Sequence, residues 1–318
     1  MDYATFVARG APTWDRMEAL AARGVADLRA AELEELVAAH RAVVSDFAWS
    51  RDRFPTAAST ARLRSLAFRG HQLLAPPEPP ALLRAWRFFS HGFPATFRRE
   101  LGPVLAGTSL FVGGTLLGCV VGTVNPDIAR LFVDEESLQG LREGRIWTDR
   151  VGELMPASAL STMIFTNNIK VALVAWAGGA LAGLGTAGAL LFNGLMFGTL
   201  LVVASRYGLL DRLNAWIAAH GPLELTLICV AGGAGFALAR GWVDDQGRPR
   251  GEALAEAGRR SVRLAVGTVP WFVLCGVVEG TISPLMGLDT GLKAAVGFGL
   301  LAIFLVYALA PRPAGAPA

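Results

Sequence analysis

Three ionisable residues lie in or beside long apolar segments, where they can do chemistry. His220 and Glu224 occur in HGPLEL, four residues apart and therefore on one face of a helix, and Glu279 occurs in VVEGTISP. A charged side chain at the centre of a bilayer costs at least about 2.5 kcal/mol, so acids in such segments are functional candidates by default. We therefore treat these three residues as the intramembrane polar candidates.

Three roles are open to these residues. Each carboxyl group can hydrogen-bond to a neighbouring helix and serve only structure. The acids can also line an ion or proton pathway. The third role is a metal site made by His220, Glu224 and Glu279, although His-x-x-x-Glu alone is a weak signal and no second histidine lies nearby. We predict no catalytic residue, no metal and no cofactor, and hence a protein that is not an enzyme.

The segments around these residues predict membrane crossings. The 35 residues from Val171 to Ser205 carry no formal charge, and a helix needs about 20 apolar residues to cross a bilayer. Of the 318 residues, 53% are hydrophobic and 17% are charged, which favours an all-α polytopic helical bundle. The predicted domain 101–310 contains about six spans: 104–124, 168–191, 194–210, 223–241, 262–282 and 291–310. The nearly uncharged segment 154–167 leaves the count open.

Three asparagines are predicted at helix ends. Asn167 and Asn168 come just before the second span, where an amide side chain can cap free backbone N–H groups. Asn193 with Gly194 is typical of a tight turn between two spans. We prefer these two roles to ligand contact.

Glycines four residues apart predict close helix packing, because small residues let backbones approach where lipid supplies little hydrophobic force. We expect a tightly packed bundle and a homo-oligomer, namely a dimer. The predicted packing residues are Gly114, Gly118, Gly122, Gly179, Gly183, Gly276 and Gly280.

The amino-terminal part differs from the rest. Residues 1–80 predict a cytoplasmic helical domain of amphipathic helices, with breaks at Pro12, Pro55 and Pro76-Pro77. Residues 81–100 alternate aromatic residues with arginines, which predicts a helix lying at the membrane interface. Since Met1 to Arg16 has no apolar core, we expect no cleavable signal peptide.

The charges of the loops predict the orientation. Residues 240–263 carry six arginines against four acids, whereas residues 125–153 carry four arginines against seven acids. Arginine-rich short loops stay in the cytoplasm, so both termini and the tail 311–318 are predicted inside, with 125–160 as an outer loop.

The three cysteines fall within predicted spans, and no basic run of the kind that tracks nucleic acid occurs. The chain has only two lysines, Lys170 and Lys293, among its 29 basic residues, a bias we attribute to genomic composition.

Several ordered motifs resemble the stage II sporulation protein M family. They are IFTNNIKVALVAWAGGALAGLGTAGALLFNGLMFG at 164–198, HGPLEL at 220–225, AGGAGFALA at 231–239 and GRRSVRLAVGTVPWFVLCGVVEGTISP at 258–284. HRAVVSDFAWSRDRFP and RGH, within 40–71, are similar to the amino-terminal extension of members that do not act in sporulation. The long amino-terminal domain departs from the sporulation type.

The resemblance implies a multi-pass protein of the cytoplasmic (inner) membrane of a prokaryote. In spore formers, the member that names the family works with two cell-wall hydrolases during engulfment. We therefore expect a scaffold whose partners are the lipid bilayer, a second copy and other membrane or envelope proteins, with no nucleic acid. The alternative is a transporter or channel in which His220, Glu224 and Glu279 line a polar path.

Overall fold

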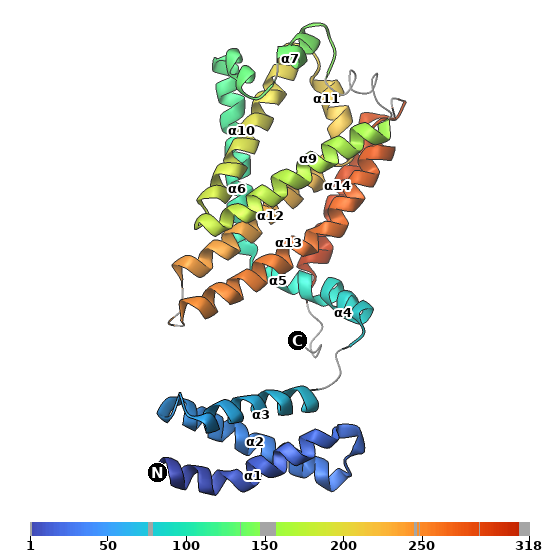
Figure 1. Cartoon of the computed structure of the whole chain (residues 1–318). Coiled ribbons are helices and arrows are strands. Elements are labelled where there is room, and N and C mark those ends of the chain that lie inside the picture. The colour runs from blue at the N-terminus through green and yellow to red at the C-terminus, as the bar shows by residue number, and fades with distance from the viewer. Residues whose placement is uncertain are drawn as a thin grey trace. The chain divides into compact units, whose positions relative to one another are not determined.

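The computed structural model describes residues 2–75, 79–133, 135–146, 157–244, 247, 249–285 and 287–311, with the side chains of all of these except 126 and 157–165 (Figure 1). The chain divides into two compact units, Met1–Pro80 and Ala81–Ala318. The described residues form helices and turns with no strand, which confirms the predicted all-α class.

The first unit is a bundle of three helices: α1 (Tyr3–Arg23), α2 (Ala30–Arg53) and α3 (Ala58–Leu74). Apolar residues at helical spacing face one shared core, to which Phe6, Trp14, Leu36, Val43 and Leu63 each contribute a side chain at most 1% exposed. Burial of these side chains is the main force that holds the three helices together.

The prolines of this unit have different effects. The predicted break at Pro55 is found, since α2 ends at Arg53 and α3 begins at Ala58. The predicted break at Pro12 is wrong, because Pro12 lies inside α1. Packing of Phe6 and Trp14 on either side of Pro12 into the core holds the helix continuous despite its missing N–H. Pro76 and Pro77 lie outside the described residues.

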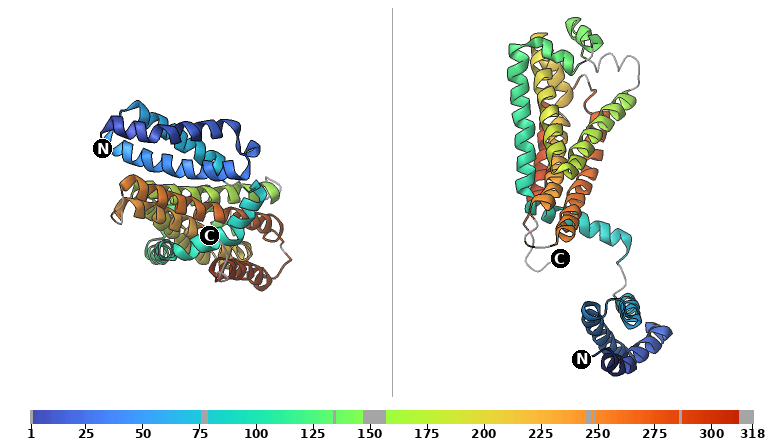
Figure 2. Two further views of the ribbon diagram at one scale, coloured as in Figure 1. Left: turned by 90° about the horizontal axis from the view of Figure 1, so that it is seen from below. Right: turned by 60° about the vertical axis from the view of Figure 1, so that its left-hand side comes forward.

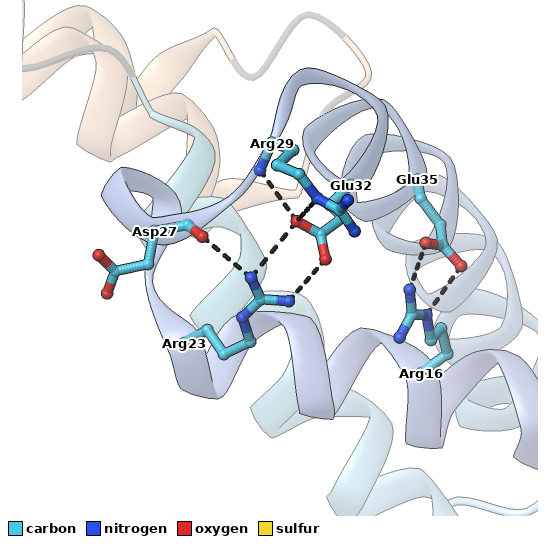
Figure 3. A network of polar contacts seen from close by, with 6 residues as sticks. All are labelled: Arg16, Arg23, Asp27, Arg29, Glu32 and Glu35. Atoms are coloured by element: carbon cyan, nitrogen blue, oxygen red, sulfur yellow. Dashed lines mark hydrogen bonds and ion pairs between the residues drawn. The ribbon is translucent and has the colours of Figure 1, made fainter.

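An ion-pair network joins α1 to the start of α2 (Figure 3). The Glu32 carboxylate, whose side chain is 11% exposed, accepts bonds from Arg23 Nη1 at 2.6 Å and from the backbone N–H of Arg29 at 2.9 Å. Arg16 pairs with Glu35 along the same face at 2.7 Å. The Arg23 guanidinium, followed by the Arg29 N–H, lowers the pKa of Glu32 to about 2.

The second unit contains five helices that are long and apolar enough to cross a membrane. They are α6 (Leu101–Val124), α10 (Leu184–Arg206), α12 (Gly221–Val243), α13 (Arg250–Thr281) and α14 (Thr290–Leu309). The other elements are α4 (Ala81–Arg87), the π turn η2 (Phe88–Gly92), α5 (Phe93–Arg99), η3 (Pro126–Leu131), α7 (Glu135–Arg142), α9 (Ala157–Ala177), η4 (Gly178–Leu181) and α11 (Leu210–Ile217).

The turn between the second and third spans is not where the sequence predicted it. Asn193 and Gly194 lie inside α10, and the chain turns instead at η4 and the left-handed pair Ala182 (φ 51°) and Gly183 (φ 86°). Asn193 is therefore not a turn residue; its side-chain amide donates to Ala189 O within its own helix. The predicted span 168–191 is divided between α9 and α10, which we attribute to uniformly apolar residues that carry no signal for the turn.

Glycines bring α6 and α10 into backbone contact (Figure 2). A methyl group added to Gly114 would lie 2.6 Å from Leu191 O, and one added to Gly118 would overlap Leu195 O and lie 2.9 Å from Thr199 N. Gly194 and Gly198 of α10 face α6 in the same way. The glycine spacing in α6 thus packs two helices of one chain, and it leaves the predicted homodimer without support from this surface.

The helix α12 lies at the centre of the unit, in contact with α6, α9, α13 and α14. Of its most apolar segment 72% is buried, against 22–39% for the other spanning helices. Gly233 meets the backbone of Val104, and Gly179 and Gly235 meet each other. Gly183 serves as the turn before α10, whereas Gly276 and Gly280 are only half-buried on α13. Small residues on α12 therefore allow the neighbouring helices to pack closely against it.

The two ends of the unit differ in their elements. At the α5 end, Arg98 donates to Ala310 O, and the buried Glu100 pairs with Arg260 at 2.8 Å and with Arg240 at 3.6 Å. At the α7 end, η3 and α7 pack on Val203 of α10 and on Leu209, the residue before α11, through a small apolar cluster that includes Leu138 and Leu141. Figure 1 shows α6 running from the α5 end to the α7 end.

Residues 81–99 do not form the single interfacial helix that the sequence predicted. Leu82 and Trp86 of α4 are 83% and 68% exposed, as an interfacial helix requires. After the π turn, however, Phe93 and Phe97 of α5 are buried against α13 and α14, where Gly267 leaves room for the Phe93 ring. The interfacial description therefore fits α4 alone.

Replacement of Gly118 by leucine should destabilise the second unit. The side chain would overlap the α10 backbone, and overpacking of this kind costs on the order of 1–3 kcal/mol. Thermal unfolding of the full chain in detergent measures the loss. Gly113→Leu is the matched control, because no atom lies within 4 Å of a methyl group at that neighbouring position. Equal melting temperatures for the two variants would contradict the packing of α6 on α10.

Replacement of Glu32 by glutamine should weaken the first unit at neutral pH and flatten its response to acid. The folded-state pKa of Glu32 is lowered from 4.5 to about 2, so its stabilisation is complete above pH 4.5 and is lost as the pH falls from about 4.5 to 2. Urea unfolding of residues 1–80 at a series of pH values, by circular dichroism, measures this. The exposed Glu34→Gln is the control. A pH profile unchanged by Glu32→Gln would disprove the role of the network.

Candidate functional site

The three polar residues predicted from the sequence meet near the α7 end of the second unit. His220 is the residue before α12, and Glu224 lies in the first turn of that helix. The two residues are 4% and 2% exposed, and His220 Nε2 lies 3.9 Å from Glu224 Oε2. The helical spacing of four residues therefore brings them together as predicted.

Glu279 reaches the same region from the last turns of α13 and is fully buried. Its carboxyl group is near enough to that of Glu224 for the two charges to repel each other. Cys275 is also buried and lies one turn before Glu279 on α13. Two helices thus hold two carboxyl groups together in a region from which water is largely excluded.

The segment that joins α13 to α14 completes the cluster. Ser283 Oγ lies 2.9 Å from His220 Nδ1, and the ammonium group of Lys293, in the first turn of α14, donates to Ser283 O at 2.8 Å. Ser283 and Lys293 are 2% and 4% exposed. The lysine therefore ties the first turn of α14 to the segment that holds His220 in place.

A cavity of about 430 Å³ opens beside His220 and Glu224. Its polar wall includes Asn167, Asn168 and Lys170 of α9, and Phe197 of α10 and Trp216 of α11 add aromatic surface. Asn168 and Glu224 line the same cavity, and Glu224 Oε1 has no hydrogen-bond partner in the described part of the chain. The Trp216 Nε1 atom is likewise buried without a partner among these residues.

The asparagines of α9 are not helix caps. Asn167 and Asn168 lie in the middle of α9, which begins at Ala157, so their backbone N–H groups are not those of a helix start. The prediction failed because apolar residues before 167 continue the helix by more than two turns. The amides are polar groups of the cavity wall instead.

Sequence reasoning missed Ser283, Trp216 and both lysines. The signal for the lysines was present: they are the only two in a chain of 29 basic residues, and each borders an apolar span. No local pattern marks Ser283, which reaches His220 only through the packing of the α13–α14 segment. Trp216 lies four residues before His220 in the sequence, but nothing in the sequence distinguishes it from an ordinary apolar residue.

The site can bind a polar molecule or accept and release a proton. The carboxyl group of Glu224, the imidazole of His220 and the ammonium group of Lys170 line one cavity and offer groups of both charges. Among the described residues, no group of three or more His, Cys, Asp or Glu is arranged to hold a metal ion.

Two family models match the chain. Residues 107–284 match stage II sporulation protein M, and residues 4–75 match a domain of unknown function, DUF8413. No curated protein and no solved structure matches. The first match begins within α6, ends just after α13 and includes His220, Glu224 and Glu279. Since it spans more than half of the sequence and agrees with the apolar spanning helices, the chain belongs to the stage II sporulation protein M family.

Proposed function

We propose that this membrane protein is a non-enzymatic scaffold that organises cell-envelope partners. The observation that carries the proposal is the closed packing of the spanning helices. Backbone contacts at Gly114, Gly118, Gly194 and Gly198 lock α6 to α10, and neighbours surround α12. Such a unit is suited to serving as a rigid support for docking partners rather than to opening a path.

The elements attached to the spanning helices offer docking surfaces. The helix α7 and the turn η3 present exposed acids, with the Asp127 and Glu135 side chains 76% and 65% exposed. Their apolar sides are packed on Val203 of α10 and on Leu209, so the segment has a defined shape for a partner. The three-helix first unit is a separate module with its own core.

The orientation we propose puts the α5 end in the cytoplasm. That end carries Arg98, Arg99, Arg240 and Arg260, and arginine-rich segments remain on the cytoplasmic side. The acidic α7 end then faces the non-cytoplasmic side of the inner membrane, where envelope partners are found.

Neutralising the exposed acids at the α7 end should weaken partner capture. We expect the variant Asp127→Asn, Glu135→Gln, Glu143→Gln to recover several-fold less envelope protein after crosslinking in cells, as quantified by mass spectrometry. A control variant, Glu34→Gln, Asp52→Asn, Glu252→Gln, changes three exposed acids elsewhere. Unchanged recovery with the first variant, or equal loss with both, would contradict docking at this surface.

The second candidate function is transport, and the buried cluster of His220, Glu224, Glu279 and Lys293 favours it. It ranks below the scaffold because the cluster is confined to the α7 end. Between it and Glu100 at the α5 end, the buried polar side chains among the described residues are hydroxyls and thiols; Thr186 and Ser261, for example, donate to backbone carbonyls. No charged side chain of the described core continues the path.

Reconstituted protein should therefore move no more protons or monovalent ions than empty vesicles. A pH-sensitive dye inside proteoliposomes measures proton flux, and a potential-sensitive dye measures net ion movement. Flux that disappears in Glu224→Gln or Glu279→Gln, but persists in the exposed control Glu252→Gln, would overturn the scaffold proposal and establish transport.

A further inference from the structure

We propose that the cavity between α9, α10, α11 and the start of α12 binds a small zwitterion, that is, a molecule with one ammonium and one carboxylate group such as a free amino acid. This goes beyond the scaffold function, since it concerns a ligand and not a protein partner. The proposal rests on a hydrogen-bond acceptor and hydrogen-bond donors that line one cavity and have no partner among the described residues.

The acceptor is Glu224. Its side chain is only 3% exposed, yet Oε1 has no hydrogen-bond partner in the described residues. The other oxygen lies 3.9 Å from His220 Nε2, which is beyond hydrogen-bond range. A buried carboxylate oxygen without a partner is costly, and an ammonium group of a ligand would satisfy it with a charge-assisted hydrogen bond.

The donors are Lys170 and Trp216. Lys170 lines the cavity from α9, is exposed at its rim, and has no ion-pair partner in the described part of the chain. The buried Nε1 of Trp216 has no acceptor there either. An ammonium group and an indole N–H together complement a carboxylate, and the Asn167 amide adds a further donor at the rim.

The choice of lysine at these positions is informative. Arginine occupies 27 of the 29 basic positions, so Lys170 and Lys293 depart from the composition of the chain, and both lie at this cluster. Lysine presents a compact point charge, whereas arginine presents a broad planar fork. A cavity of about 430 Å³ has room for an amino acid beside an ammonium group.

The remaining wall sets the nature of the rest of the ligand. Phe197, Leu200, Ile217 and Leu225 are apolar, so a ligand with an aliphatic side chain fits better than one with a second charge. A divalent cation is disfavoured, because the described residues hold no cluster of three metal-ligating side chains.

Binding of L-leucine and L-alanine to the full chain in detergent tests the proposal. Thermal unfolding and tryptophan fluorescence are the readouts, with methylamine and acetate as probes for each half of the ligand. We expect saturable stabilisation by at least one of the two amino acids and none by methylamine or acetate at the same concentration. Stabilisation by neither amino acid, or equal stabilisation by methylamine alone, would overturn the zwitterion site.

Two variants locate the binding. Glu224→Gln and Lys170→Gln should each weaken affinity by about 10-fold to 100-fold, the range for loss of one charge-assisted hydrogen bond. Because Lys170 is on the rim, the Lys170→Gln variant should fold normally. It therefore tests the location of binding even if the Glu224→Gln variant does not fold. Glu252→Gln, exposed on α13, is the control. Affinity unchanged by Lys170→Gln would overturn the proposal, whatever the outcome of the partner-capture experiment.

Discussion

Close approach of helix backbones is the constraint on which the second unit depends. In lipid, apolar side chains gain little by leaving one apolar neighbour for another, so van der Waals contact between backbones supplies much of the association between helices. Where Gly114 and Gly118 of α6 meet Gly194 and Gly198 of α10, no side chain separates the two backbones. The arrangement of α12, and with it the position of Glu224, follows from this contact and from the similar contacts of Gly233 and Gly235.

The polar cluster is tolerated because packing and local bonds surround it. His220 is oriented by Ser283, the carbonyl of Ser283 accepts from Lys293, and Asn168 lines the same cavity as Glu224. These contacts join α9, α12 and the α13–α14 segment at one end of the unit. The acids are therefore held in place by groups from several helices, and a change in any of them alters the environment of the rest.

Much of the fold could be predicted from hydropathy, because an apolar run of about 20 residues has few alternatives to a spanning helix. The spans around 104–124, 223–241 and 291–310 match helices to within a few residues. The turn after α9 could not be found, since Gly179 and Gly183 look like packing glycines in sequence and only the structure gives Ala182 and Gly183 their left-handed conformation. Only part of the site could be predicted. Helical spacing relates His220 to Glu224, but no spacing rule relates these two residues to Asn168, Ser283 or Lys293.

The burial of α12 also has a consequence for biosynthesis. Chains enter the membrane from the amino terminus onward, so α6, α9 and α10 are made before α12, and α13 and α14 are made after it. Until α13 arrives, the face of α12 that will pack against it is open to lipid or to the insertion machinery. Closure of the unit by its carboxyl-terminal helices is thus a late step of assembly, and a nascent chain that stops before Arg250 would leave the central helix only partly enclosed.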